Sequence, residues 1–359
     1  MRFLDEYRDK KIVAALAARI RKTSKSKVML MEVCGGHTTA VHKSGIPSLL
    51  PENITLLSGP GCPVCVTSIE FIDKAIALCR TEGVTVATYG DLVRVPGSAS
   101  SLEKEKANGC DVRMVYSVLE ALDLAEKNLG RNVVFLGIGF ETTAPATALA
   151  LIQAGKMNLE NFFVLSSHKV MPPVMKALVT DGIKINGFLA PGHVSAITGS
   201  AMYAPIAEKF HIPVVISGFE PVDILQSVLM LVRQIENKRS EVEIQYTRVV
   251  KPEGNLAAQK VLAEVFTAKD DWWRGFGIIP QSGLKIGNAF RKFDAEDHFS
   301  IHIPKPVEPK GCICGELLKG LKTPFDCRLF GKVCRPDNPI GACMVSQEGI
   351  CAAYYRYER

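Results

Sequence analysis

The sequence has no apolar run that approaches the roughly 20 residues needed to cross a bilayer as a helix. It also lacks the positively charged start of a secretory signal, because Asp5, Glu6 and Asp9 precede a short apolar stretch over residues 12–18. We therefore expect a cytoplasmic protein that has no membrane contact. In a reducing cytosol, clustered cysteines are more often metal ligands or reactive thiols than structural disulfides.

Basic charge is in excess only at the start of the chain. The formal net charge of the whole sequence is +6, and residues 1–27 alone hold nine Lys or Arg against three Asp or Glu. Apolar residues in this segment follow helical spacing, which predicts an amphipathic first helix with a solvated basic face. We therefore do not expect a nucleic-acid partner.

The first 240 of the 359 residues repeat one pattern: a short run rich in Val, Ile and Leu, a loop with glycine, and a helical segment. This pattern is typical of an α/β fold with mostly parallel sheets flanked by helices. It predicts eight strands, over residues 28–33, 54–58, 84–88, 112–116, 133–138, 162–166, 187–190 and 213–217.

Eight strands are many for one open sheet, so we predict two lobes that face a central cleft. The helical run over residues 117–128 is taken as the crossover between them. The predicted domains are a first lobe over residues 1–120, a second lobe over 121–240 and a smaller, irregular C-terminal domain over 241–359. Irregular backbone in the last domain suits loops that carry ligands.

Reactive residue types follow several of the predicted strands. Open α/β sheets bind ligands outside the carboxyl ends of their strands, so these residues should face one space. Cys34 is followed by two glycines and His37; a nearby imidazolium or helix amino terminus would lower the pKa of its thiol and favour the thiolate. A buried, inert cysteine is the alternative.

Cys62 and Cys65 form a C-x-x-C motif in a strand-to-helix turn after Gly59-Pro60-Gly61. This spacing can close a small disulfide or supply half of a zinc site. Because no second pair follows at the usual zinc spacing, redox or transient metal chemistry is the preferred interpretation. Cys79 and Cys110 stand apart from such motifs and are interpreted as structural cysteines.

Two further strand ends carry titratable side chains. Glu141 follows Gly137 and Gly139, where a dinucleotide-binding fingerprint would need a third glycine that is absent, so NAD and FAD are not expected. Glu141 can cap a helix or face the cleft. His193, in the loop Pro191-Gly192-His193, is a structural histidine or a group for proton transfer or anion binding.

Six of the eleven cysteines lie in the last 48 residues. Four thiolates can hold an iron–sulfur cluster, and two then remain as a possible redox pair. Zinc is the competing metal, but six thiols exceed the four that it takes. The six are Cys312, Cys314, Cys327, Cys334, Cys343 and Cys351.

Five motifs together resemble the HypD family of NiFe-hydrogenase maturation factors. They are CGGHT at 34–38, GPGCPVC at 59–65, GFETT at 139–143, PGHVS at 191–195 and CMVSQEGICAAYY at 343–355. The resemblance implies a maturation scaffold with redox activity rather than a conventional turnover enzyme. On it an iron centre with two cyanides and one carbon monoxide is assembled, together with a small chaperone, HypC, and a cyanide donor, HypE.

The resemblance also implies roles for residues. Cys34 would ligate the iron being assembled, with His37 beside it, while Cys62 and Cys65 would be a redox pair. The terminal domain would hold a 4Fe-4S cluster. By analogy with ferredoxin-thioredoxin reductase, we assign the cluster to Cys314, Cys327, Cys334 and Cys351, and the adjacent disulfide to Cys312 and Cys343; Cys312 as a ligand remains an alternative.

Two other functions remain open at this point. One is a stand-alone iron–sulfur thiol-disulfide reductase of the ferredoxin-thioredoxin reductase type, which would use the terminal thiols and the C-x-x-C motif. This function gives no role to Cys34 and His37. A structural protein that is stabilised by a zinc site is the third possibility.

Overall fold

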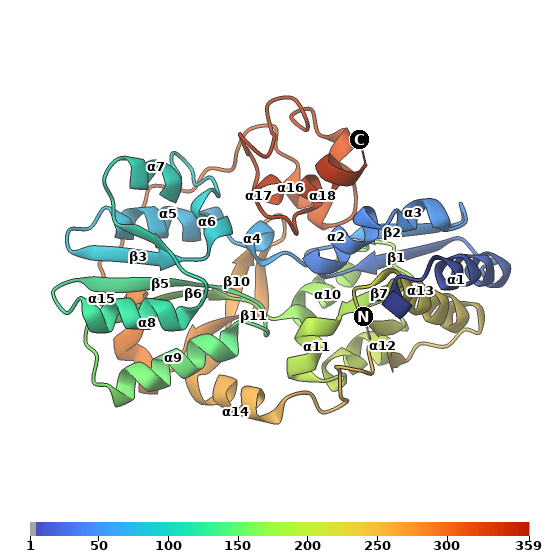
Figure 1. The fold of residues 1–359 in the computed structure, drawn as a ribbon, viewed down its shortest axis with the longest axis horizontal. Coiled ribbons are helices and arrows are strands. Elements are labelled where there is room, and N and C mark those ends of the chain that lie inside the picture. Colours follow the sequence, from blue (N-terminus) through green and yellow to red (C-terminus); the bar gives the residue numbers. More distant parts are fainter. Residues whose placement is uncertain (1–4, 359) are drawn as a thin grey trace.

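Two parallel β-sheets form the body of the molecule. The structure is a computed structural model that describes residues 5–358 (Figure 1). Sheet A has the strand order β2-β1-β7-β8-β9 and sheet B the order β4-β3-β5-β6, and within each sheet all neighbouring strands are parallel. The α/β fold class predicted from the sequence is confirmed. The strands are β1 (Val28–Glu32), β2 (Ile54–Ser58), β3 (Val84–Thr88), β4 (Val112–Met114), β5 (Asn132–Gly139), β6 (Phe162–His168), β7 (Gly187–Pro191), β8 (Val214–Ser217) and β9 (Val242–Ile244).

The central strands are buried on both faces. Every residue of β3, β6, β7 and β8 is buried. Strands covered by helices on both sides read as continuous apolar runs, which is why the sequence locates them well.

The strands are grouped differently from the sequence prediction. The chain leaves sheet A after β2, builds all of sheet B, and returns to sheet A at β7. The predicted lobes, with four consecutive strands each, are therefore wrong in their strand grouping. The run over residues 117–128 is helix α8 (Val118–Lys127), which connects β4 to β5 within sheet B rather than one lobe to the other.

Helices cover both sheets. The predicted amphipathic first helix is α1, which buries Leu16, Ala17 and Ile20 and packs against α13 beside sheet A (Figure 1). The helices associated with sheet A are α1 (Lys10–Thr23), α2 (Gly35–Lys43), α3 (Ile46–Leu49), α10 (Met171–Thr180), α11 (Gly192–Thr198), α12 (Ala204–Phe210) and α13 (Pro221–Glu236). Those associated with sheet B are α5 (Ile69–Cys79), α6 (Gly90–Val93), α7 (Leu102–Ala107), α8, α9 (Ala144–Lys156) and α15 (Ala295–His298).

A β-hairpin lies where the sequence suggested irregular backbone. Strands β10 (Phe266–Trp273) and β11 (Gly277–Ile286) pair antiparallel after helix α14 (Leu256–Val265), and β11 packs against β6 and α10. The register shifts between Lys269 and Asp271, which breaks the regular alternation that identifies a strand in a sequence. Buried Lys169 ties this hairpin to sheet B through Asp271, at 2.8 Å.

The C-terminal segment lies over the region where the two sheets meet (Figure 1). It contains three short helices joined by irregular loops, α16 (Cys314–Leu318), α17 (Ala342–Val345) and α18 (Ile350–Tyr357). Helix α18 packs on α2, and α17 packs on the one-turn helix α4 (Pro63–Val66). Within residues 5–358 no helix is both long enough and apolar enough to span a membrane.

Candidate functional site

Two of the predicted motifs meet at the carboxyl end of β1. Cys34 follows this strand as the N-cap of α2, and the amide of Gly35 donates a hydrogen bond to the carbonyl of Gly61 at 3.0 Å. A Cβ atom at Gly61 would overlap the backbone nitrogen of Cys34, so only glycine permits this approach. Gly61 directly precedes Cys62, and the turn that carries the C-x-x-C motif therefore lies against Cys34.

Glu32 holds the backbone around Cys34. One of its carboxyl oxygens accepts a hydrogen bond from the Cys34 amide at 3.0 Å, and the other accepts one from the Thr38 hydroxyl at 2.5 Å. Burial raises the pKa of Glu32 to about 8, so the carboxyl is largely protonated at neutral pH. Glu32 was not predicted as a site residue, although an acidic residue inside a buried strand is a signal that could have identified it.

The Cys34 thiol is held in its protonated form. Burial, followed by the negative charge of Glu348, raises its pKa to about 12, and the backbone amides of His37 and Gly36 oppose this only in part. The expectation that the setting of Cys34 lowers its pKa is therefore wrong, because desolvation outweighs the helix amino terminus. A metal ion would have to displace the proton.

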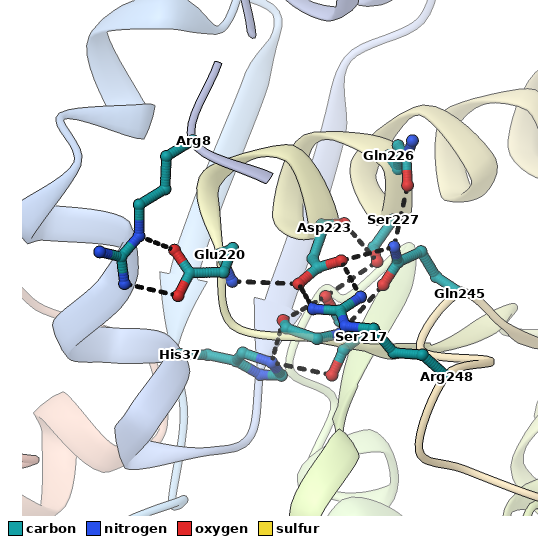
Figure 2. A network of polar contacts seen from close by, with 10 residues as sticks. Arg8, His37, Ser217, Glu220, Asp223, Gln226, Ser227, Gln245 and Arg248 are labelled. Atoms are coloured by element: carbon teal, nitrogen blue, oxygen red, sulfur yellow. Dashed lines mark hydrogen bonds and ion pairs between the residues drawn. The ribbon is translucent and has the colours of Figure 1, made fainter. Parts of the chain in front are cut away.

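His37 is buried and neutral. Its Nε2 atom lies 3.0 Å from the carbonyl oxygen of Gly218 and 3.3 Å from that of Ser217 (Figure 2). Because carbonyls only accept hydrogen bonds, Nε2 carries the hydrogen and Nδ1 is the acceptor. Nδ1 has no hydrogen-bond partner within the part of the chain that the structure describes. Burial lowers the pKa of His37 to about 4, so His37 supplies no imidazolium to Cys34.

Phe219 separates two of the predicted site histidines. Its ring stacks on His37, with centroids 4.5 Å apart, and on His193, with centroids 4.0 Å apart. His193 is exposed, whereas His37 is buried, so the three rings form a stack from the surface to the Cys34 loop. Phe219 was not singled out from the sequence, although it lies within the quoted Gly218-Phe219-Glu220 turn.

A polar network fixes the turn that carries Phe219 (Figure 2). Buried Asp223 caps α13 and binds Arg248 at 2.6 Å, while Glu220 binds Arg8 at 2.7 Å. Ser227 donates to Ser217, the residue whose carbonyl faces His37. The strand-end carboxylates Glu220 and Asp223 thus position the turn and are already occupied by arginines.

Cys62 and Cys65 are joined by a disulfide at the start of α4, with their Cα atoms 5.2 Å apart. Both are buried. The Cys65 sulfur lies 4.0 Å from the carbonyl oxygen of Ala342, the residue before Cys343. The C-x-x-C motif therefore lies between Cys34 on one side and the cysteine-rich segment on the other.

Glu141 approaches the same region from sheet B. Its Oε1 atom accepts a hydrogen bond from the Met171 amide at 2.9 Å, and its buried Oε2 atom has no hydrogen-bond partner among residues 5–358. Burial raises the pKa of Glu141 to about 7. Burial raises the pKa of Tyr203, a fully buried residue whose hydroxyl bonds to Ser195 at 3.0 Å. Ionised Glu141 or Cys34 would raise this pKa further, so Tyr203 lies near both residues.

The C-terminal thiols gather around one small, mostly enclosed cavity. Its other lining residues are mainly apolar: Ile313, Leu317, Leu329, Phe330 and Gly341. The cysteines that line it are Cys312, Cys314, Cys327, Cys334 and Cys351. Thiols are the donor type that iron–sulfur clusters use. No group of three or more His, Cys, Asp or Glu side chains within residues 5–358 has the spacing of a ready metal site.

Cys343 lies outside this lining. Its thiol helps to raise the pKa of Cys314, whose sulfur lies 3.2 Å from that of Cys312. All six terminal cysteines are free thiols. The disulfide between Cys312 and Cys343 and the assignment of four cluster ligands stay predictions.

Arg274 joins the C-x-x-C segment to the terminal thiols. This residue was not predicted from the sequence. Its amide donates to the Val66 carbonyl at 3.0 Å and its Nε to the Thr67 carbonyl at 3.2 Å, both just after Cys65. The next residue, Gly275, packs directly against Gly315, which follows Cys314. The guanidinium is buried. The hydrogen bond with Cys314 raises the pKa of Cys312, the pKa of Cys343 is also raised, and the charge of Arg274 opposes both shifts only in part.

Comparisons with known proteins agree with the motifs. A family model named HypD, described as "Hydrogenase formation hypA family", matches residues 11–358. The hydrogenase maturation factor HypD of Azotobacter vinelandii is 48% identical over 369 residues, which cover 100% of this chain and 97% of the relative. The protein of the same name from Escherichia coli is 45% identical over 368 residues, which cover 100% of this chain and 99% of the relative.

Proposed function

Because the chain belongs to the HypD family, we propose that it acts in hydrogenase maturation, as a scaffold for assembly of an iron centre that carries cyanide and carbon monoxide. The observation that carries this proposal is the approach of Gly61 to Cys34, which brings a single thiol and a disulfide-bonded pair together. Cytoplasmic location, a HypC-type chaperone that shares the iron and a HypE-type cyanide donor belong to the same proposal.

Cys34 is the proposed ligand of the iron that is being assembled. A soft thiolate suits iron that bears cyanide and carbon monoxide. The thiol has a pKa of about 12, so iron binding releases a proton and becomes tighter as the pH rises. Glu32 orients the Cys34 backbone and is itself largely protonated at neutral pH, so it adds little charge beside the metal.

Cys62 and Cys65 are the proposed redox pair of the scaffold. Reduction of their disulfide takes up two electrons and two protons and yields two thiols, which can return those electrons to the iron centre or its ligands. The position of Cys65 beside Ala342 supports electron entry from the C-terminal segment. Arg274 binds the backbone after Cys65 and keeps the two segments together.

The terminal thiols are the proposed holders of a 4Fe-4S cluster, with Cys314, Cys327, Cys334 and Cys351 as ligands and with Cys312 and Cys343 as an adjacent redox pair. A bound cluster supplies one-electron chemistry to the neighbouring thiols. Burial raises the pKa of Cys351 well above its ordinary value, so metal binding at this set also has to displace protons.

Infrared absorption in the cyanide and carbonyl region tests the scaffold. The wild-type chain, purified without oxygen together with its small chaperone, is expected to show these bands, and Cys34→Ala is expected to lose them. Cys110→Ala is the matched control, since Cys110 is also half-buried and lies outside the site. Bands that persist in Cys34→Ala would refute the scaffold and favour the stand-alone disulfide reductase.

A further inference from the structure

Two cysteines that share no sequence motif lie close together at the end of sheet B where its strands begin. Cys79 is the last residue of α5, and Cys110 lies between α7 and β4. Both thiols line one cavity, and the proximity of Cys110 helps to raise the pKa of Cys79. Around them lie the amino ends of β3 and β5, far from the carboxyl ends where Glu141 lies.

The pair lines a solvent-accessible cavity of about 690 Å³. Three arginines, Arg80, Arg113 and Arg131, also line it, together with the carboxylates of Glu82 and Asp111. A cavity of this size accepts a small peptide-sized molecule. The three guanidinium groups pair with carboxylates of the protein, Arg80 with Glu105 and both Arg113 and Arg131 with Asp111, so the cavity is polar rather than strongly cationic.

We infer that Cys79 and Cys110 are a second redox-active thiol pair, which a small-molecule disulfide such as oxidised glutathione converts into an intramolecular disulfide. The Cys110 thiolate attacks one sulfur of the glutathione disulfide, forms a mixed disulfide and releases one glutathione thiolate. Cys79 loses its proton to solvent, attacks the Cys110 sulfur and releases the second glutathione. The two protein thiols are oxidised, and one glutathione disulfide is reduced to two thiols.

The order of attack follows from the surroundings of the two thiols. Cys79 is buried and donates to the Ile76 carbonyl at 3.1 Å, whereas Cys110 is half-exposed at the cavity. Burial, and then the neighbouring Cys110, raise the pKa of Cys79 to about 12, so Cys79 is the poorer first nucleophile. A mixed disulfide at Cys110 removes the neighbouring ionisable thiol, the second cause of that raised pKa, which makes the second step easier.

The backbone beside Cys110 has room for the small movement that bond formation needs. Gly109 has a φ of +98°, and a Cβ atom there would meet no atom within 4 Å. The preceding turn is held by hydrogen bonds from Asn108 and Gly109 to α7. Closing the bond would join the end of α5 to the start of the edge strand β4, two segments 31 positions apart in the chain.

Peptide mapping of the full chain tests this inference. The wild-type protein is treated with oxidised glutathione, unfolded in an alkylating reagent without reductant, and digested. We expect a peptide in which Cys79 and Cys110 are linked, at the expense of their separately alkylated peptides. Separate alkylation of both cysteines in the treated wild-type protein would overturn the inference, and this arm needs no variant.

Two variants test the order of attack. In Cys79→Ala, Cys110 is expected to retain glutathione as a stable mixed disulfide. In Cys110→Ala, Cys79 is expected to be modified at least about tenfold more slowly, because it is buried. Equal modification of the remaining cysteine in the two variants would contradict the proposed order, and no glutathione on Cys110 in Cys79→Ala would overturn the reaction itself.

Discussion

The α-carbon of Gly61 lies so close to the backbone nitrogen of Cys34 that no side chain fits between them. This approach brings a thiol at the end of β1 beside the disulfide that opens α4. Both residues follow strands of sheet A, and the pairing of β1 with β2 places their loops next to each other.

Substitution of Gly61 by Ala should therefore separate these loops. We expect the free energy of unfolding to fall by at least about 2 kcal/mol, because the added methyl group meets backbone atoms that cannot turn away. Urea unfolding measures the change. Gly130→Ala is the control, since a Cβ there meets no atom within 4 Å, and it should stay within about 0.5 kcal/mol of wild type.

Substitution of Glu141 by Gln should change how stability depends on pH. Burial raises the pKa of Glu141 from 4.5 to about 7, so its contribution to stability is complete below pH 4.5 and declines as the pH rises to about 7. Glutamine can still accept the Met171 hydrogen bond but does not ionise.

Relative to the variant, the wild-type protein should therefore lose about 3 kcal/mol of unfolding free energy across that pH range. Denaturant unfolding at several pH values measures this difference. A difference that is the same at pH 4 and pH 8 would contradict the assignment.

Substitution of Phe219 by Ala should expose His37. Phe219 stacks on that imidazole and covers it from the side of His193. We expect the pKa of His37 to rise from about 4 toward 6.5, followed by NMR titration of the imidazole protons. Phe219→Leu keeps an apolar cover and should leave the pKa close to the wild-type value.

Substitution of Arg274 by Gln should loosen the join between the C-x-x-C segment and the terminal thiols. The guanidinium is buried, donates to Thr67 and binds Glu308 at 2.6 Å. We expect a loss of about 2–4 kcal/mol, because the variant leaves buried acceptors unpaired. Arg291→Gln, which breaks an exposed pair with Asp297, should cost less than about 1 kcal/mol in the same assay.

Replacing each terminal cysteine by Ala should divide the six into two groups. In protein purified without oxygen, iron content should fall by at least about half in the variants of the four proposed ligands, since three thiolates hold a four-iron cluster poorly. Cys312→Ala and Cys343→Ala should retain their iron. Full retention in Cys327→Ala would rule out the proposed ligand set.

Local features of the fold could be predicted from the sequence, whereas long-range ones could not. The eight predicted strands are rich in apolar residues, so all of them were located within a few residues. Which strands share a sheet depends on pairings between distant segments, such as Met31 with Phe188, and no local pattern reports these pairings. The hairpin β10–β11 was missed because a register shift and charged exposed positions hide its alternation.

The same distinction holds for the site. Cys34, Cys62 and Cys65 belong to local motifs, and the structure brings them together. Glu32, Phe219, Tyr203 and Arg274 matter through contacts with residues far along the chain, so their roles become visible only in three dimensions. The neutral state of His37 has the same origin, because the burial that lowers its pKa includes the stacked ring of Phe219, a residue far along the chain.

The chain forms sheet B between strands β2 and β7 of sheet A, and this order affects folding during synthesis on the ribosome. Sheet B is complete once residue 168 has been made, but β1 gains its second neighbour only when β7, over residues 187–191, has emerged. Until then the strand that leads to Cys34 is an open edge, and the carbonyls of Ser217 and Gly218 that hold His37 do not yet exist. The nascent chain thus completes the surroundings of Cys34 late, after all strands of the other sheet have been made.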